Sequence, residues 1–316
     1  MHRNYFENRL IHYRLSRLEL YGKIAPMPPL STIDLHLHTY FSDGRASPQE
    51  LVEYAASIGM QTIAITDHDN ARGARQARPL AEQLGLTLIP AIELTCRWDA
   101  SQAPPGKTDI DVLGYFLDLD RLGFQAFETE ILDDFQERTD IGCWYLSAAG
   151  YPLSIEDVFQ ENPHYVGTHH LIMAVMHKGY ATSFDRALEL VDSIWMNVRP
   201  SNYTIDQVIA MIRQSGGVPV LAHPTIVPWP TGWLNAEAAR LLVSMGLEGM
   251  EIYHPRLNAE ARQYFLALAN QFSLLITGGS DDHGWPEGFA RLGSQEVTPE
   301  MVRGLKEKAQ YLHCLI

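Results

Sequence analysis

The sequence predicts an α/β protein with a parallel sheet covered by helices, and two observations support this prediction. Short apolar segments alternate with helical segments along much of the chain, which is typical of parallel β/α folds. His, Asp or Glu also follows most of the apolar segments, where barrels of this kind place their reactive side chains. The 316 residues are enough for one large barrel or two small domains, and 46% hydrophobic residues indicate a substantial core.

Charge and composition exclude several classes of function. The formal net charge of -14 opposes long phosphate backbones, so we expect no stable binding of long nucleic acid. Charged residues interrupt each apolar stretch, and we therefore expect no membrane span. The first residues lack the pattern of a secretory signal, and the 3 cysteines are too scattered for a disulfide framework. A cytoplasmic protein is expected.

The first expected elements follow an N-terminal extension and linker, residues 1–31. A short strand ends at Leu35. The next helix opens at Ser47, where a serine cap, a proline in the first turn and Glu50 three residues later form a capping-box signal. The further elements expected in this part are a strand at 62–66, a helix at 73–84, and strands at 87–92 and 110–116.

The alternation pauses over residues 118–200. Helices are expected there at 124–149, 155–161, 169–178 and 184–192. We interpret this segment as a helical insertion over the active-site face, because loops at that face carry function in such folds. The alternation then resumes with a helix at 205–215 and strands at 218–222, 249–253 and 274–277. The barrel domain is thus expected to span residues 32–316.

The stretch from His36 to Gly44 is the strongest functional signal. His36 and His38 follow a strand, and residues two apart on a strand project to the same face. A turn closed by Gly44 allows Asp43 to fold back toward both imidazoles. Imidazoles and a carboxylate are good ligands for zinc, manganese or iron. An isolated pair would be better interpreted as surface histidines, but similar residues recur at later strand ends.

Those later strand ends supply the rest of a candidate metal centre. The additional ionisable residues are His68, Glu93, Asp111, His223, Asp281 and His283. One metal takes three or four protein ligands, so eight or nine candidates indicate two or three ions, with Glu93 suited to bridge them. A serine charge-relay triad, a Walker phosphate loop and a dinucleotide fingerprint find no support in the sequence.

These motifs resemble the polymerase and histidinol phosphatase (PHP) family of metal-dependent phosphoesterases. The matching segments are Asp-Leu-His-Leu-His-Thr at 34–39, Ser-Asp-Gly at 42–44, Thr-Asp-His-Asp at 66–69, Glu93, Ala-His-Pro at 222–224 and Gly-Ser-Asp-Asp-His-Gly at 279–284. The resemblance implies a distorted, TIM-like (β/α)7 barrel with a centre of manganese, iron or zinc. Within the family, the chain resembles stand-alone bacterial nucleotide phosphatases, which carry a helical insertion between the fourth and fifth strands.

The resemblance also implies roles for single residues. The first metal would be held by His36, His38, Glu93 and Asp281. The remaining metals would take Asp43, His68, His223 and His283. Asp111 stands where the family usually has histidine, and it is either a replacement ligand or a solvated acid. Asp67 would orient His68 or His36. In the insertion, His170 matches a family histidine, whereas Thr168 stands in place of an arginine.

The function predicted from this centre is hydrolysis of phosphomonoesters of small metabolites, nucleotides such as AMP or a nucleoside 3′,5′-bisphosphate. A metal-bound hydroxide would attack phosphorus. The candidate proton donors are His223, His283 and Asp69. The candidate substrate-binding residues are His170, Arg72, Arg199 and His254. A surface ion pair is the simpler interpretation of either arginine, and a hydrogen-bonded rim residue is an equally good one for His254.

Other functions stay open at this point. The same centre would also suit a histidinol-phosphate phosphatase or a 5′–3′ exonuclease acting on short RNA. A metal-dependent amide or ring hydrolase shares the logic of the barrel. A non-catalytic metal-binding regulatory module is the alternative from another class, and it would be favoured by the loss of several ligands.

Overall fold

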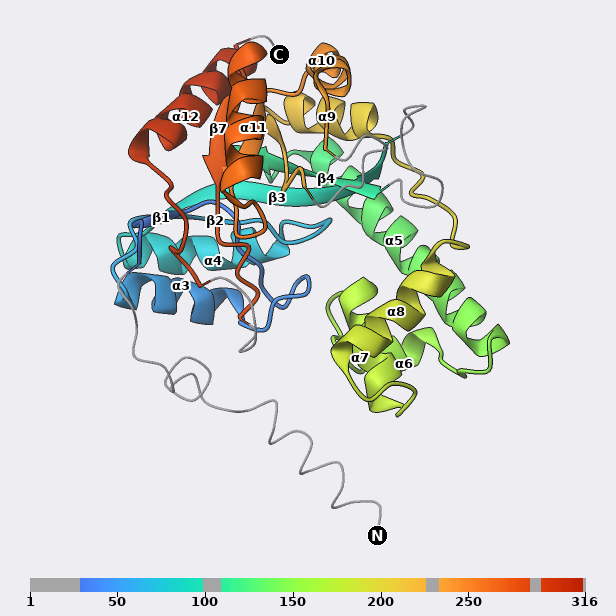
Figure 1. Ribbon diagram of the computed structural model, residues 1–316. Helices are drawn as coiled ribbons and strands as arrows, with labels where there is room; N and C mark the ends of the chain where they lie inside the picture. The colour runs from blue at the N-terminus through green and yellow to red at the C-terminus, as the bar shows by residue number, and fades with distance from the viewer. Residues whose placement is uncertain (1–28, 99–108, 226–232, 285–290, 315–316) are drawn as a thin grey trace.

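The computed structural model describes residues 29–98, 109–225, 233–284 and 291–314 (Figure 1). Residues 1–28, most of the predicted N-terminal extension, lie outside the described residues. Within the described part, seven strands form one sheet in sequence order. The strands are β1 (Ile33–Asp34), β2 (Thr62–Ile65), β3 (Thr87–Arg97), β4 (Asp109–Tyr115), β5 (Val218–Leu221), β6 (Gly249–Tyr253) and β7 (Leu275–Gly278).

The sheet differs from the fully parallel one that the sequence predicts, because β4 runs antiparallel to both β3 and β5. All other neighbouring strands are parallel. Only residues 98–108 separate β3 from β4. A short connection suits an antiparallel pair, whereas a parallel pair needs a crossover of about a dozen residues or more. β3 also continues past the predicted end at Ile92 to Arg97, where it pairs with Asp109.

The two edges of the sheet meet beyond the ends of their strands. A single parallel bridge joins Leu37, after β1, to Asp282, after β7. The backbone N–H of Asp281 donates to the His36 carbonyl at 3.0 Å, and that of His38 donates to the Asp282 carbonyl at 3.1 Å. The predicted barrel is therefore distorted, because its edges are joined by loop residues and not by a ladder of strand residues. This bridge places the His-x-His segment beside the last strand end.

Helices cover the outside of the sheet (Figure 1). They are α3 (Pro48–Ser57), α4 (Arg72–Gln83), α9 (Ile205–Gln214), α10 (Ala236–Met245), α11 (Ala259–Gln271) and α12 (Pro299–His313). The predicted capping box opens α3: the Ser47 side chain accepts from the Glu50 N–H, and Glu50 accepts from the Ser47 N–H. No helix in the described segments is long and apolar enough to cross a membrane.

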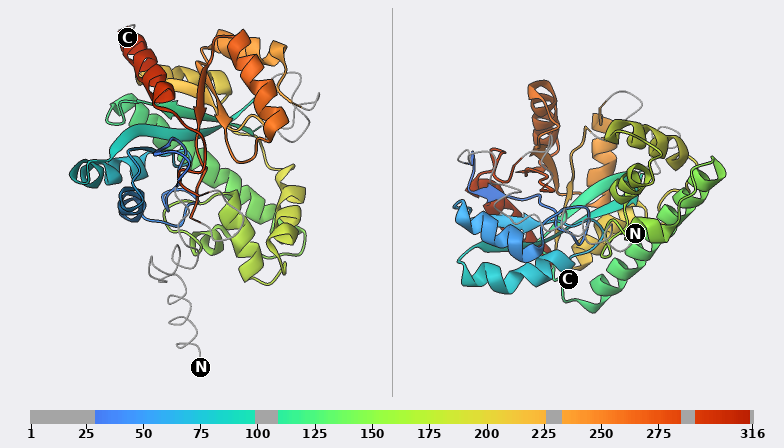
Figure 2. Two further views of the ribbon diagram at one scale, coloured as in Figure 1. Left: turned by 60° about the vertical axis from the view of Figure 1, so that its left-hand side comes forward. Right: turned by 90° about the horizontal axis from the view of Figure 1, so that it is seen from below.

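Four further helices form a helical lobe at one end of the sheet, as Figures 1 and 2 show. The lobe consists of α5 (Leu122–Ala148), α6 (Ile155–Phe159), α7 (Thr168–His177) and α8 (Phe184–Trp195). It has its own apolar cluster, which includes Cys143, Leu171 and Val191. The long helix α5 runs from the sheet into this lobe, so one element belongs to both parts of the molecule.

Candidate metal centre

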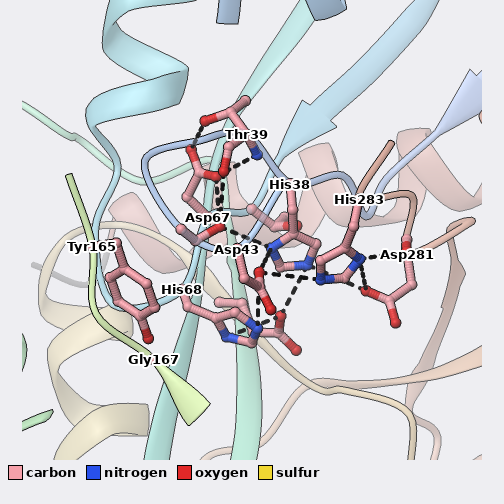
Figure 3. Close-up of polar contacts among 12 residues, drawn as sticks. His38, Thr39, Asp43, Asp67, His68, Tyr165, Gly167, Asp281 and His283 are labelled. Atoms are coloured by element: carbon pink, nitrogen blue, oxygen red, sulfur yellow. Dashed lines mark hydrogen bonds and ion pairs between the residues drawn. The ribbon is translucent and has the colours of Figure 1, made fainter. Parts of the chain in front are cut away.

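The side chains at the strand ends converge where β1 and β7 end. Figure 3 shows His38, His283 and Asp43 turned toward one another, with His68 beside them. Among the described residues, four groups have candidate ligand atoms that all lie within 4.8 Å of one another. The groups are His38 with Asp43, His68 and His283; His36 with His254 and Asp281; His36 with Glu93 and His223; and His68 with Glu93 and Asp111. Shared members connect the groups, so all nine predicted ligands lie in one cluster.

Glu93 is at the middle of this cluster. It lies on β3, and its side chain is almost fully buried. Its Oε1 is 2.9 Å from His223 Nε2, and its Oε2 is 3.1 Å from His36 Nε2. Oε2 also lies 3.3 Å from His38 Nε2 and 3.4 Å from His68 Nδ1. Burial by itself would raise the pKa of Glu93, but the imidazoles around it, His36 first, hold that pKa well below its usual value. Each of its two oxygens therefore lies within 3.4 Å of a candidate ligand nitrogen.

Glu251 is a site residue that the sequence analysis missed. It lies on β6 and is fully buried. Its Oε1 is 2.9 Å from His36 Nδ1, and its Oε2 accepts from the His223 backbone N–H at 3.0 Å. A His36 Nδ1–H that donates to Glu251 leaves the Nε2 lone pair free for a metal. The signal in the sequence was a lone carboxylate inside an otherwise apolar strand.

The loop that carries His38 and Asp43 is held by Asp67. Oδ1 of Asp67 accepts from the Thr39 backbone N–H at 2.6 Å, and Oδ2 accepts from the Thr39 hydroxyl at 2.7 Å. The Ser42 hydroxyl donates to Oδ1 at 2.8 Å and lies 3.2 Å from His38 Nδ1. Asp67 therefore fixes the loop and acts on the His38 ring through Ser42.

This arrangement corrects the expectation that Asp67 orients His68 or His36. No hydrogen bond joins Asp67 to either ring among the described residues. Gly73, in the first turn of α4, explains how the carboxylate is accommodated: a Cβ there would lie 2.0 Å from Asp67 Oδ2. A glycine is needed at this position because the helix approaches the buried carboxylate so closely.

Asp43 and His283 form a close pair within the cluster. Oδ1 of Asp43 is 3.1 Å from His283 Nε2, 3.7 Å from His38 Nδ1 and 3.8 Å from His68 Nε2. The rings of His283 and His38 stack with centroids 4.1 Å apart. Burial opposes the charged form of His283, yet Asp43 and Asp281 raise its pKa to about 9. A bound cation would reverse this preference, because it repels the ring proton.

Asp111 and Asp69 border the same region. Asp111 lies on β4, belongs to the group with His68 and Glu93, and its Oδ1 accepts from the Thr95 hydroxyl at 2.7 Å. Asp69 accepts from the Thr95 backbone N–H at 2.9 Å and from the Tyr165 hydroxyl at 3.3 Å. Burial raises the pKa of Asp69 to about 7. The carboxyl of Asp69 is thus bonded to a residue of the lobe.

His254, a candidate substrate-binding residue, lies among the candidate ligands. Its ring is buried, its Nε2 is 3.2 Å from Asp281 Oδ2, and it groups with His36.

Asp69, His223 and Asp281 have positive φ angles of 58°, 21° and 54°. Such conformations are costly for residues other than glycine, and they gather at functional sites.

The two predicted substrate arginines have other contacts. Arg199 forms ion pairs with Asp134 at 2.7 Å and Glu137 at 2.6 Å, both on α5. These contacts match the interpretation of Arg199 as a member of a surface ion pair. Arg72 donates to the His164 carbonyl at 2.7 Å. Both guanidinium groups therefore bond to the helical lobe.

His170 is likewise an internal residue of the lobe. Its Nδ1 accepts from the Gly167 N–H at 3.2 Å, and its Nε2 is 3.3 Å from Asn162 Nδ2. Burial lowers the pKa of His170 to about 4. Its neighbour His169 lines the cavity, whereas His170 does not.

A cavity of about 210 Å³ separates the cluster from the helical lobe. Its lining residues are Asp43, His68, Thr95, Asp109, Asp111, Phe135, Tyr165, Gly167, Thr168 and His169. Figure 3 shows Tyr165 across from His68 and Asp43. Candidate metal ligands therefore form one wall of the cavity, and the lobe forms the opposite wall.

The donor set fits divalent metal ions. Imidazoles and carboxylates within 4.8 Å of one another match the preferences of zinc, iron and manganese. The residues that contact the candidate ligands also suit a metal site. Glu251 contacts Nδ1 of His36 and Ser42 contacts Nδ1 of His38, so the Nε2 atom of each ring is left for an ion. Cysteine takes no part, since the buried Cys96 and Cys143 belong to apolar clusters.

Comparisons with known proteins agree with this geometry. A family profile described as the PHP domain matches residues 34–216. The 5′–3′ exoribonuclease Rnm of Escherichia coli is 29% identical over 277 residues, which is 86% of this chain and 92% of the relative. The 3′,5′-nucleoside bisphosphate phosphatase of Chromobacterium violaceum is 25% identical over 288 residues, or 87% of this chain and 95% of the relative.

A solved structure gives the same result for the fold. A protein from Bifidobacterium adolescentis, described as a candidate metal-dependent phosphoesterase, superposes with a TM-score of 0.76 at 27% identity. The match covers 89% of this chain and 98% of that protein. The similarity therefore includes the helical lobe as well as the sheet.

Proposed function

The chain belongs to the PHP family, and from that premise we propose that it is a metal-dependent phosphoesterase that removes phosphate from small nucleotides, such as AMP or a nucleoside 3′,5′-bisphosphate. The observation that carries this proposal is the convergence of nine candidate ligands around Glu93 beside a cavity of about 210 Å³. Relatives of nearly the same length that act on phosphate esters of nucleotides support the substrate class.

We propose two or three ions of manganese, iron or zinc at this centre. The residues that would hold them are His36, His38, Asp43, His68, Glu93, Asp111, His223, Asp281 and His283. We propose that His254 joins them, because its ring groups with His36 and Asp281. When bound, such ions supply positive charge to phosphate oxygens and lower the pKa of water. Glu251 and Asp67 would keep the ligand rings in place during turnover.

We assign three roles to the four residues expected to act in catalysis. Both oxygens of Asp67 are occupied by Thr39 and Ser42, so we propose that it only positions the loop. His223 Nε2 faces Glu93, which favours a ligand role. Of the remaining two, Asp69 is the stronger candidate for moving a proton to the leaving oxygen, because an ion held by His283 would displace the ring proton. Matched His283→Gln and Asp69→Asn variants should differ in the alkaline limb of the pH–rate profile, which only the proton donor would change.

One alternative has specific support. The similarity to an exoribonuclease favours the 5′ end of a short RNA as a second candidate substrate. Release of mononucleotides from a 5′-phosphorylated oligomer would establish that reaction. Release of inorganic phosphate from AMP would establish the first.

The test is metal analysis of the purified protein combined with a phosphate-release screen in Mn²⁺. The panel contains AMP, adenosine 3′,5′-bisphosphate, histidinol phosphate and a 5′-phosphorylated trinucleotide. His38→Ala should abolish phosphate release and reduce the bound metal, because His38 belongs to a ligand group with Asp43, His68 and His283. His313→Ala, at an exposed position on α12, is the matched control. Full activity of His38→Ala would contradict the proposal.

A further inference from the structure

The wall of the cavity formed by β4 carries two carboxylates on one face. Asp109 and Asp111 are two residues apart, so their side chains point to the same side of the strand, and both line the cavity. Asp111 groups with His68 and Glu93 at the metal centre. Asp109 lies two residues from Asp111, which is about 7 Å along β4 and farther from the metal centre. A molecule that fills the cavity from the metal centre outward would therefore have Asp109 within reach.

Within the part of the chain that the structure describes, only one oxygen of Asp109 has a hydrogen-bond partner. Arg138 Nη2 donates to Oδ2, whereas Oδ1 is buried and has no hydrogen-bond partner among the described residues. The Arg138 side chain is 2% exposed, and its Nε donates to the Arg199 carbonyl at 3.1 Å. The rings of Phe135 and Trp195 each lie 5.5 Å from the guanidinium. The bonds of Arg138 Nε and Nη2 hold Oδ2 of Asp109 on one side, which leaves Oδ1 as an unused acceptor; Arg138 Nη1 is likewise buried without a hydrogen-bond partner among the described residues.

The size of the cavity and the residues of its opposite wall limit which chemical groups can reach Oδ1 of Asp109. The cavity volume of about 210 Å³ is the volume that about seven molecules occupy in liquid water. A group of the size of a sugar fits in this space. The rings of Phe135 and Tyr165 stack on the opposite side, with centroids 5.9 Å apart and planes at 19°. Such rings offer a flat apolar surface. No Lys or Arg belongs to the described residues that line the cavity.

We propose that Asp109 is a specificity-determining residue that accepts a hydrogen bond from a free hydroxyl of the leaving alcohol. The preferred substrates are then 5′-phosphomonoesters of ribose-like polyols in which that hydroxyl carries no phosphate. This inference rests on the proposed function and narrows its substrate class.

Chemistry at Asp109 separates the candidate substrates. In a nucleoside 5′-monophosphate, the 2′ and 3′ hydroxyls lie a few bonds beyond the ester oxygen. That distance is on the order of the spacing between Asp111 and Asp109 along β4. Each is a donor that satisfies Oδ1 of Asp109. A 3′-phosphate offers only acceptors and adds like charge opposite the carboxylate, which is unfavourable. The 3′-esterified first nucleotide of an RNA likewise lacks one of the two donors.

The first experiment uses the wild-type protein alone, loaded with Mn²⁺. We would measure kcat/KM for AMP, its 2′-deoxy and 3′-deoxy analogues, adenosine 3′,5′-bisphosphate and p-nitrophenyl phosphate. Loss of the hydroxyl that faces Asp109 should lower kcat/KM about 10- to 100-fold, because a buried acceptor is left unpaired. The bisphosphate should be disfavoured to a similar degree. Equal values for AMP and both deoxy analogues, or a preference for the bisphosphate, would overturn the inference.

A variant then assigns the effect to Asp109. Asp109→Asn should reduce the ratio of AMP to bisphosphate kcat/KM about 10-fold, because an amide removes the negative charge. Asp120→Asn, in an exposed pair with Arg78, removes a carboxylate elsewhere and should keep the wild-type ratio. An unchanged ratio in Asp109→Asn would refute the assignment. If that variant does not fold, the wild-type series still decides the inference. Failure of the wild type to hydrolyse any phosphomonoester, p-nitrophenyl phosphate included, would instead refute the proposed function.

Discussion

At the scale of single residues, Glu251 shows how a buried carboxylate that touches no substrate can control the centre. It accepts from His36 Nδ1 and from the His223 backbone N–H with different oxygens. The His36 ring and the β5 end are therefore fixed by one side chain. β6, which supplies this side chain, pairs with β5 on one side and β7 on the other.

We predict that Glu251→Gln lowers metal retention about 10- to 100-fold. Glutamine has one acceptor oxygen, so one of the two N–H groups would face an amide donor. The measurement is bound metal after dialysis against a chelator, with circular dichroism to verify folding. Glu248→Gln is the matched control, since Glu248 pairs with Arg213 and Lys308 on the outside of the sheet. Equal metal retention in the two variants would show that Glu251 does not position a ligand.

His170 provides a pH-dependent test. Its pKa is about 4 in the folded protein, against 6.5 for an unperturbed imidazole. Between these values the unfolded chain binds a proton that the folded one does not, so stability falls as pH drops through this window. From pH 7 to pH 5, this group should cost about 2 kcal/mol in the free energy of unfolding.

The measurement is urea unfolding of wild type and His170→Gln at both pH values, with chelator present throughout. Subtracting the two proteins removes the contribution of the other histidines, which they share. The variant should lose about 2 kcal/mol less than the wild type on acidification. Identical losses would mean that the folded protein does not depress the His170 pKa.

The sequence predicted which candidate ligands lie together better than it predicted the residues that contact them. His36, His38 and Asp43 belong to one local motif, so their convergence follows from strand and turn geometry alone. Glu251 joins His36 across 215 positions of chain, and no local pattern encodes that contact. Asp67 was recognised as a supporting residue, but its partners Thr39 and Ser42 depend on how the loop folds.

At the scale of elements, strand positions were predictable and strand direction was not. An apolar segment shows where β4 runs, but its alternation reads the same in either direction. The decisive fact is the short connection after β3, which favours an antiparallel return. The antiparallel direction of β4 matters for the site, because it places Asp109 two residues beyond Asp111 on the wall of the cavity.

The contact between the helical lobe and the ligand loop depends on Asn162, between α6 and α7. Its Nδ2 donates to the carbonyls of Tyr40 and Ser42, both at 2.8 Å, and its Oδ1 accepts from the His164 N–H at 2.8 Å. Asp43 follows directly after Ser42. The lobe therefore holds the segment that supplies one of the candidate ligands.

We predict that Asn162→Asp weakens metal binding and lowers kcat/KM about 10- to 100-fold, because two carbonyls would lose their donor and face a carboxylate. Metal titration and phosphate release measure the two effects. Asn202→Asp, at an exposed position, controls for the added charge. If Asn162→Asp bound metal like the wild type, the lobe would not position Asp43.

At the scale of the whole molecule, α5 connects the apolar cluster of the lobe with one in the barrel, because Phe124 and Ile131 belong to the barrel cluster and Cys143 belongs to the cluster of the lobe. Its Glu128 is buried, bonds to Arg75 of α4 at 2.6 Å and accepts from the Ala71 N–H at 2.7 Å. Arg138, on the same helix, pairs with Asp109 of the sheet. Opening the lobe by itself would break these charged and buried contacts, which costs several kcal/mol. We therefore expect the lobe and the barrel to unfold together.

The cysteines test this expectation, because each buried one reports on a different part. Cys96 is buried in the barrel cluster, Cys143 lies in the lobe cluster with its pKa raised to about 12 by burial, and Cys314 is exposed. Only a thiolate reacts with iodoacetamide, so the two buried thiols should stay unmodified until unfolding exposes them. Mass spectrometry across a urea series should show both becoming reactive at the same urea concentration, with Cys314 modified from the start. Modification of Cys143 at a concentration that still protects Cys96 would show that the lobe opens independently, which would contradict a single cooperative unit.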